Sequence, residues 1–256
     1  MTRQQQEAQR SLYEEFHRHL RHAKRIPQET DFALVNHLGM FAKHIREGQR
    51  ILDLGCGGAG FSLYAAGRGA DVLGVDVSTH AIEENRKAAD YLSLPKLHFA
   101  CEDVAEFTTD ERFDCVMLIE VLEHLPDDLR MLRKIHGFLE EDGLLLMSVP
   151  SSNAPLHRHY VKRYGHDPFD ARVGHLRRYD APSVFNLLHA AGFELLEFKL
   201  CEGLLRNWLF NDRVGQLFMR FNRKFIRHVV TFLDERLFLP AWGESDIIVV
   251  ARKARR

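Results

Sequence analysis

Cysteine is scarce in this chain, and the few cysteines are scattered. The 256 residues include four, at Cys56, Cys101, Cys115 and Cys201, and no two of them form a C-x-x-C pair. This spacing excludes a disulfide-rich scaffold and a zinc site built from paired thiolates. Because most of these cysteines stand in apolar runs, we expect buried thiols in a protein of a reducing compartment.

Long apolar runs and an excess of one charge are also missing. No run approaches the ~18 apolar residues of a membrane span, and the N-terminal stretch MTRQQQEAQRSLYEEF lacks the apolar segment of a signal peptide. The formal net charge is −1, which gives no sign of a nucleic-acid or membrane partner. We therefore expect a soluble, cytoplasmic protein.

The apolar residues that are present occur in short runs, with helix-length segments between them. Hydrophobic residues make up 45% of the chain, which is enough for a full-sized core. Nearly continuous apolar strands that alternate with helices indicate βαβ units and a parallel sheet covered on both faces. The predicted strands are residues 50–55, 70–76, 96–103, 113–120, 143–150, 193–200 and 245–253.

Helical periodicity and turn residues divide the rest of the chain. Helical spacing of apolar residues predicts helices over 4–25, 30–46 and 181–191. The stretch 151–180, which contains several prolines and glycines, is expected to be a loop. The predicted parts are an N-terminal helical cap (1–48), an α/β core (49–202 and 244–256) and a helical insertion before the last strand (203–243).

A glycine-rich turn with the pattern G-x-G-x-x-G directly follows the first predicted strand. Its glycines are Gly55, Gly57 and Gly60, and glycine permits both a tight turn and the close approach of a ligand to the backbone. Asp76 ends the next strand, where an acidic side chain can accept hydrogen bonds from both hydroxyls of a ribose. A turn that merely joined a strand to a helix would not explain this acidic partner.

Two nucleoside cofactors compete for such a turn. NAD would place a pyrophosphate at the helix N-terminus, whereas S-adenosylmethionine carries a cationic amino group and a sulfonium. Asp53, Asp76 and Asp103 form an acidic rim near the strand ends. A carboxylate beside a pyrophosphate is unfavourable, so the rim favours S-adenosylmethionine.

At these residues the sequence resembles the class I S-adenosylmethionine-dependent methyltransferases. The resemblance is carried by LDLGCGGAG, GVDVS, CEDV, FDCVMLIEVLEHLPD and LEEDGLLLMSVPS, which together cover about residues 45–150. It implies a Rossmann-like α/β fold with a seven-stranded, mostly parallel sheet, helices on both faces and an antiparallel last strand. It also implies an enzyme that takes S-adenosylmethionine as its cofactor.

The resemblance assigns cofactor-binding residues position by position. For the methionine part of the cofactor they are Asp53, Gly55, Cys56 and Gly57 in the turn, with Ile119 and Glu120 at the border of the methionyl end. For the adenosine part they are Asp76 at the ribose and Val77, Asp103 and Val104 at the adenine.

The stretch EVLEHL follows the fourth predicted strand and carries a candidate metal site. If a helix begins there, Glu120, Glu123 and His124 share one face and, with His175, suit Mg²⁺ or Mn²⁺. The arrangement resembles that of small-RNA 3′-terminal 2′-O-methyltransferases, and quinone-type O-methyltransferases carry a similar stretch. The sequence after HLRRYD lacks the aromatic and basic pattern of the RNA enzymes. We therefore favour a pocket role for His124 without a metal, and no nucleic-acid partner.

Residues 151–180 leave the sheet at the same edge and are rich in histidine, arginine and tyrosine. A general base at neutral pH is most often His, so His175 is the first candidate, with Tyr179 and His124 as the others. The arginines suit an anionic acceptor such as a carboxylate or phosphate. The alternative is that they form Arg–Asp pairs that hold the segment closed. This stretch also resembles bacterial methyltransferases that look associated with envelope glycan or lipid assembly.

The insertion 203–243 combines apolar residues at helical spacing with many basic residues. Such a segment suits a lid over the pocket or a homodimer interface. The alternatives are attachment to an anionic membrane surface, with a lipid-linked substrate, and plain core packing.

These observations predict an S-adenosylmethionine-dependent methyltransferase that acts on a hydroxyl of a small molecule in a biosynthetic pathway. The alternatives are N-methylation, cyclisation or aminoalkyl transfer with the same cofactor, a metal-assisted RNA 2′-O-methyltransferase, and a non-catalytic cofactor-binding protein. The sequence does not name the acceptor.

Overall fold

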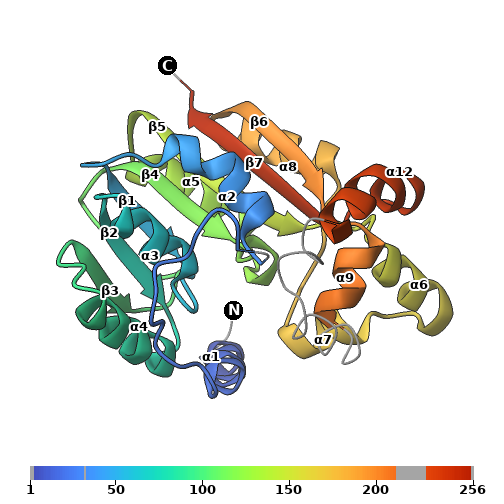
Figure 1. Cartoon of the computed structure of the whole chain (residues 1–256), viewed down its shortest axis with the longest axis horizontal. Coiled ribbons are helices and arrows are strands. Elements are labelled where there is room, and N and C mark those ends of the chain that lie inside the picture. Colours follow the sequence, from blue (N-terminus) through green and yellow to red (C-terminus); the bar gives the residue numbers. More distant parts are fainter. Residues whose placement is uncertain (1–2, 32, 212–228, 255–256) are drawn as a thin grey trace.

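The computed structural model describes residues 3–31, 33–211 and 229–254, which fold around one sheet (Figure 1). Its strand order is β3-β2-β1-β4-β5-β7-β6, and β7 runs antiparallel to both of its neighbours. The strands are β1 (Arg50–Leu54), β2 (Asp71–Asp76), β3 (Leu97–Cys101), β4 (Phe113–Ile119), β5 (Leu139–Pro150), β6 (Phe193–Cys201) and β7 (Asp246–Lys253). The predicted seven-stranded, mostly parallel sheet is confirmed.

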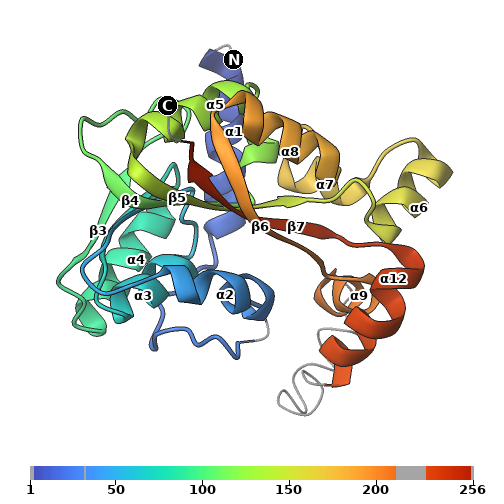
Figure 2. The ribbon, with the colours of Figure 1, turned by 90° about the horizontal axis from the view of Figure 1, so that it is seen from above.

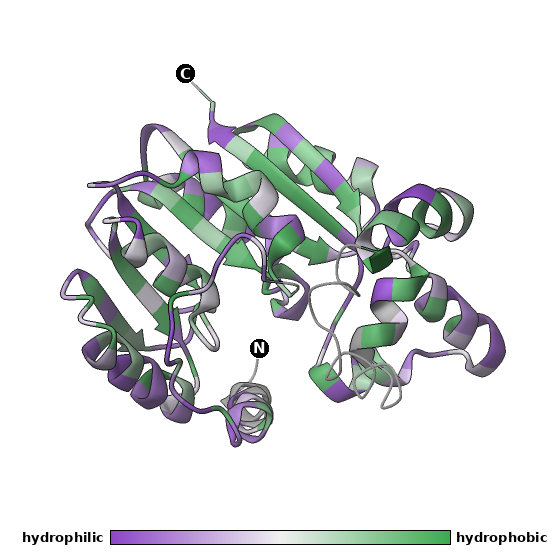
Figure 3. Cartoon of the chain, in the orientation of Figure 1, coloured by the Kyte–Doolittle hydropathy of each residue, from purple (hydrophilic) through white to green (hydrophobic). Residues whose placement is uncertain are grey.

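Helices cover both faces of the sheet, as the view in Figure 2 shows. On one face lie α2 (Val35–Phe41), α3 (Gly60–Gly67) and α4 (Thr79–Tyr91), and on the other lie α5 (Asp128–Phe138) and α8 (Ala181–Ala190). Successive strand residues alternate between the two cores: Ile247 joins one and Ile248 the other. Because both faces are buried, most residues of the central strands are hydrophobic (Figure 3).

The parallel strands end at one edge of the sheet, and this edge positions the site. The chain order reverses between β1 and β4, and the crevice outside the carboxyl ends of strands at such a point is the usual ligand site of this architecture. The N-terminal helix α1 (Arg3–His17) packs against α4 beside this edge (Figure 1).

The N-terminal helices are shorter than predicted. The helix predicted over 4–25 ends at His17, and the next segment runs beside α4, where the backbone N–H of His22 donates to Glu84 at 2.7 Å. The helix predicted over 30–46 begins at Val35 and gives way to a 3-10 turn, η1 (Ala42–His44).

The prediction of a loop over 151–180 is wrong, because this segment contains two helices. They are α6 (Pro155–Tyr164) and α7 (Pro168–Val173). Each begins with a proline, which suits the first helical position because no hydrogen bond is lost there. Gly165 and Gly174 end the two helices with φ of 79° and 81°, in the left-handed conformation that glycine adopts at little cost. The prolines and glycines therefore mark helix ends.

The insertion before β7 is helical where the structure describes it. It contains α9 (Leu204–Asn211), a helical stretch over 229–233, the π-helical turn η3 (Asp234–Phe238) and α12 (Leu239–Trp242). The carboxylate of Asp234 accepts from the backbone N–H of Gly203 at 2.7 Å and of Leu205 at 2.9 Å, which ties the two ends of the insertion together. The apolar and basic residues predicted within 212–228 lie outside the described residues. In the described ranges, no helix is both long and apolar enough to cross a membrane.

Candidate functional site

Two cavities meet at the carboxyl edge of the sheet. The first, of about 370 Å³, lies against the glycine-rich turn, the ends of β2 and β4, and α1. The second, of about 590 Å³, is lined by residues of α6 and α7 and by Asp246 at the start of β7. Glu120, Phe169 and His175 line both cavities. A molecule in one cavity would therefore face a molecule in the other across these three side chains.

The glycine-rich turn forms one wall of the first cavity. Gly55 has a φ of 74°, and a Cβ atom there would lie 2.4 Å from the Val121 side chain. Gly57 has a φ of 46°, and its backbone N–H donates to the Asp76 carboxylate at 2.8 Å. A larger residue would be strained at either position, so the turn keeps its backbone bare toward the cavity.

The predicted cofactor-binding residues separate into two groups. Those that line the first cavity are Gly55, Gly57, Asp76, Val77, Asp103, Val104 and Glu120. Asp53, Cys56 and Ile119 are not among its lining residues, and the buried Asp53 accepts a hydrogen bond from the Ser62 hydroxyl at 2.5 Å. Burial raises the pKa of Asp53 to about 7. Through Ser62, Asp53 is joined to α3, on the side of the turn that faces away from the cavity.

Helix α1 covers the first cavity, which the sequence pattern does not reveal. Tyr13, Phe16 and His17 contribute to the cavity wall. Glu14 fixes the helix in place, because its carboxylate accepts from the backbone N–H of Thr79 at 2.7 Å and from the hydroxyl of Ser78 at 3.0 Å. The helical spacing of apolar residues predicted a helix here, but not the cavity that Phe16 lines.

Glu120 leaves β4 in an unusual backbone conformation. Its φ is 53°, and the following residues form a 3-10 turn, η2 (Leu122–His124), so no helix begins at Glu120. The conditional expectation that Glu120, Glu123 and His124 share a helix face is therefore not met. The Glu120 side chain is exposed, and the space that it faces is that of the two cavities it lines. Burial, together with the nearby Asp246, raises its pKa to about 8, so it is largely protonated at neutral pH.

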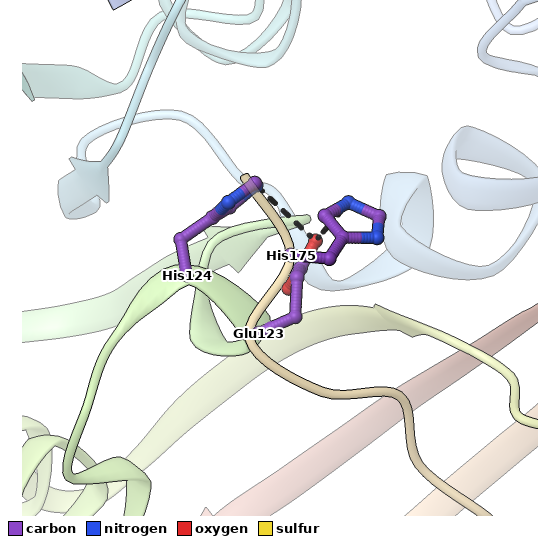
Figure 4. A group of neighbouring side chains, drawn as sticks. All are labelled: Glu123, His124 and His175. Atoms are coloured by element: carbon purple, nitrogen blue, oxygen red, sulfur yellow. Dashed lines mark ion pairs between the residues drawn. The ribbon is translucent and has the colours of Figure 1, made fainter. Parts of the chain in front are cut away.

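Glu123, His124 and His175 come together in a group of their own (Figure 4). The Nε2 atoms of both histidines lie 3.7 Å from Oε1 of Glu123. Glu123 is fully buried, and neither of its carboxylate oxygens has a hydrogen-bond partner in the part of the chain that the structure describes. Burial raises the pKa of Glu123 and lowers that of His124 to about 4. Three of the four predicted metal ligands thus form one group, whereas Glu120 lies in another.

That other group contains two residues that sequence reasoning missed. His37 of α2 and Asp246 of β7 lie beside Glu120 at the second cavity. They are distant in the sequence from the motifs and from each other, so only the folded chain brings them together.

His175 is held by a carboxylate and an arginine. Its Nδ1 lies 2.8 Å from Asp170 Oδ1, and Arg178 donates two hydrogen bonds to the same carboxylate, at 2.7 and 3.0 Å. With Nδ1–H donating to Asp170, the neutral ring carries its lone pair on Nε2. Burial alone would raise the pKa of Asp170, but the hydrogen bonds from His175 and Arg178 hold it below its usual range.

Tyr179, the second predicted base, lines neither cavity. It is 5% exposed, and its hydroxyl lies 3.1 Å from Asp128 Oδ2 and 3.4 Å from the carbonyl oxygen of Leu122. Burial raises its pKa above the usual value for a tyrosine. These contacts give Tyr179 a structural role beside the site rather than in it.

The Asp170 ion pair predicts a pH-dependent stability difference. At pH 7, Asp170→Asn should lower the free energy of unfolding by about 1–3 kcal/mol, because the variant loses a charge-assisted hydrogen-bond pair. The folded pKa of Asp170 is depressed, so its stabilisation is fully present above the unfolded pKa near 4 and is lost progressively as the pH falls from there through the lower folded pKa.

Urea denaturation at a series of pH values measures this difference. The gap between native protein and variant should shrink from about pH 5 to about pH 3, whereas Asp110→Asn, in an exposed loop, should show no such gap. A gap that stays constant over this range would contradict the ion-pair account.

Comparisons with known proteins agree with this architecture. A family model described as "Methyltransferase domain" matches residues 17–197. A curated relative, "Ubiquinone biosynthesis O-methyltransferase" of Coxiella burnetii (strain Dugway 5J108-111), is 35% identical over 108 residues, which are 42% of this chain and 46% of that protein. The chain thus spans about half the length of the curated relatives it matches.

Solved structures share the fold over most of the chain. A SAM-dependent methyltransferase from Archaeoglobus fulgidus has a TM-score of 0.59 and 18% identity, and the match covers 87% of this chain and 95% of that one. The 1,6-didemethyltoxoflavin-N1-methyltransferase of Burkholderia thailandensis, with bound 1,6-didemethyltoxoflavin and S-adenosylhomocysteine, has a TM-score of 0.57 and 20% identity, with coverage of 87% and 79%. The family match extends over more than half of the sequence. The chain therefore belongs to the methyltransferase-domain family, among the class I S-adenosylmethionine-dependent methyltransferases.

Proposed function

We propose that this protein transfers a methyl group from S-adenosylmethionine to a hydroxyl oxygen of a small molecule. One observation carries the proposal: His175, oriented by Asp170, lines both cavities. A base at the junction of a donor cavity and an acceptor cavity is the arrangement that this transfer requires.

The first cavity suits the methyl donor. Its volume of about 370 Å³ falls in the range of small-molecule sites. The bare backbone at Gly55 and Gly57 leaves room for the methionyl part, and Asp76 and Asp103 supply acceptors for ribose hydroxyls and an adenine amino group. When bound, S-adenosylmethionine supplies an electrophilic methyl group. The phosphate of a dinucleotide would instead meet the carboxylate of Asp76.

The second cavity has a lining of both acidic and basic residues. Its acidic lining residues include Glu120, Asp167, Glu202 and Asp246. Arg178 and Arg172 line it too: the Arg178 guanidinium is paired with Asp170, whereas that of Arg172 lies 5.3 Å from the centre of the Phe169 ring. The alternative in which Arg–Asp pairs close the segment therefore describes Arg178, and an anionic acceptor would have to bind at Arg172.

The chain's own residues would act mainly by positioning and by proton transfer. Nε2 of His175 would accept the proton of the acceptor hydroxyl, and Asp170 would stabilise the imidazolium that forms. His124, with its pKa lowered to about 4, is a weaker base, and its Nδ1 is engaged with the Gly174 carbonyl at 3.1 Å. Helix α1 and Phe169 would keep water away from the junction.

Asp76→Ala tests the donor half of the proposal. The variant removes a ribose acceptor and the carboxylate that holds the Gly57 turn, so the affinity for S-adenosylhomocysteine should fall by about tenfold to a hundredfold or more. Isothermal titration calorimetry measures it. Asp71→Asn, at the exposed start of the same strand, is the matched control. Near-native affinity of Asp76→Ala would refute the placement of the cofactor.

His175→Gln tests the catalytic half. We expect methyl transfer to fall by about a hundredfold or more, while the affinity for S-adenosylhomocysteine stays close to native. Transfer of a labelled methyl group to a panel of hydroxylated acceptors gives the readout. His159→Gln, on the exposed side of α6, should keep full activity. If His175→Gln turned over as fast as the native protein, another group would have to be the base.

A further inference from the structure

A group of metal-ligand side chains lies where the two cavities meet, separate from Glu123 and the histidines beside it. It consists of His37 from α2, Glu120 from the turn after β4, and Asp246 from the start of β7. One ring nitrogen or carboxylate oxygen from each lies within 4.8 Å of the others. All three residues line the second cavity.

The buried members of this group have unused ligand atoms. His37 is 7% exposed and Asp246 is 6% exposed. Neither ring nitrogen of His37 makes a hydrogen bond to the described part of the chain, although Nε2 lies 3.2 Å from Asp246 Oδ2. The other carboxylate oxygen of Asp246, Oδ1, also lacks a partner among the described residues. Burying polar atoms without partners is costly, so a ligand at this point would recover that cost.

The group is held in position before any ligand arrives. The ring of His37 packs against Phe41 and Phe61, with centroid distances of 6.0 and 5.6 Å. Glu120 accepts a hydrogen bond from the Ser148 hydroxyl at 2.7 Å. Ligands that are fixed by such surrounding contacts bind a metal with little reorganisation.

The two carboxyl groups of this site lie close to each other and face one imidazole. Glu120 is largely protonated in the absence of a ligand, so a cation that binds here would displace its proton. Two basic side chains whose charge acts on His37, Arg206 and Lys199, also contact other carboxylates. Arg206 lies 3.0 Å from Glu202, and Lys199 lies 3.1 Å from Glu235.

We propose that His37, Glu120 and Asp246 bind a divalent cation of the Mn²⁺ or Zn²⁺ class. One imidazole with two carboxylates is a ligand set for such borderline metals. Three protein ligands leave coordination positions toward the second cavity, where a water or an acceptor oxygen could bind. The proposal that the cation binds does not depend on the proposed function, whereas a role for the cation in activating the acceptor hydroxyl rests on it.

Mn²⁺ titration of the whole chain tests this site. Calorimetry and electron paramagnetic resonance should show one bound Mn²⁺ per chain, and spin-echo modulation should show coupling to one histidine nitrogen. His37→Gln and Asp246→Asn should each weaken binding by at least about tenfold. His157→Gln is the matched control, because His157 lines the same cavity from α6 and pairs with Asp167. This variant should bind Mn²⁺ normally.

Several results would overturn the proposal. The first is a lack of Mn²⁺ binding at millimolar concentrations, and the second is normal binding by both His37→Gln and Asp246→Asn. The third is loss of binding in His124→Gln together with coupling to two histidine nitrogens, because this result would place the ion at Glu123. Titration of the same variants with S-adenosylhomocysteine separates the outcomes, because His37 and Asp246 do not line the first cavity. If the protein bound S-adenosylhomocysteine normally but bound no Mn²⁺, the metal site would be rejected and the proposed function would not.

Discussion

The way in which the chain leaves β4 determines the rest of the site. Glu120 has a φ of 53°, a conformation that costs a residue other than glycine about 1 kcal/mol or more. Ser148 of the neighbouring strand compensates, because its carbonyl oxygen accepts from the Glu120 N–H at 3.1 Å and its hydroxyl donates to the Glu120 carboxylate. As a consequence, Glu120 lies between the two cavities, Val121 closes over Gly55, and Glu123 is buried beside His124 and His175.

The donor half of the molecule could be predicted from the sequence because its signals are local. Apolar runs buried on both faces identify the strands, and parallel strands bring their carboxyl ends to one edge. Gly55, Gly57, Asp76 and Asp103 stand at those ends, so their meeting in one cavity follows from the strand order. The choice of S-adenosylmethionine over a dinucleotide depends on the same placement, since it needs only the charge of the side chains there.

The acceptor half could not be predicted to the same depth, because it depends on long-range packing. Proline and glycine are common both in loops and at the two ends of a helix, where Pro155 and Gly165 stand. The sequence therefore did not distinguish α6 and α7 from a loop. His37 reaches the site from α2 and Asp246 from the last strand, with no motif that links them. His175 was identified by residue type alone, and only the fold shows that Asp170 holds its Nδ1 and that the residue lines both cavities.

The central claim is that donor and acceptor meet at Glu120 and His175, and a crystal structure with S-adenosylhomocysteine tests it most directly. The account predicts the ribose hydroxyls at Asp76 and the sulfur facing the wall formed by Glu120 and His175, with the second cavity open beyond it. A cofactor whose sulfur points away from that wall, or one that binds outside the first cavity, would contradict it.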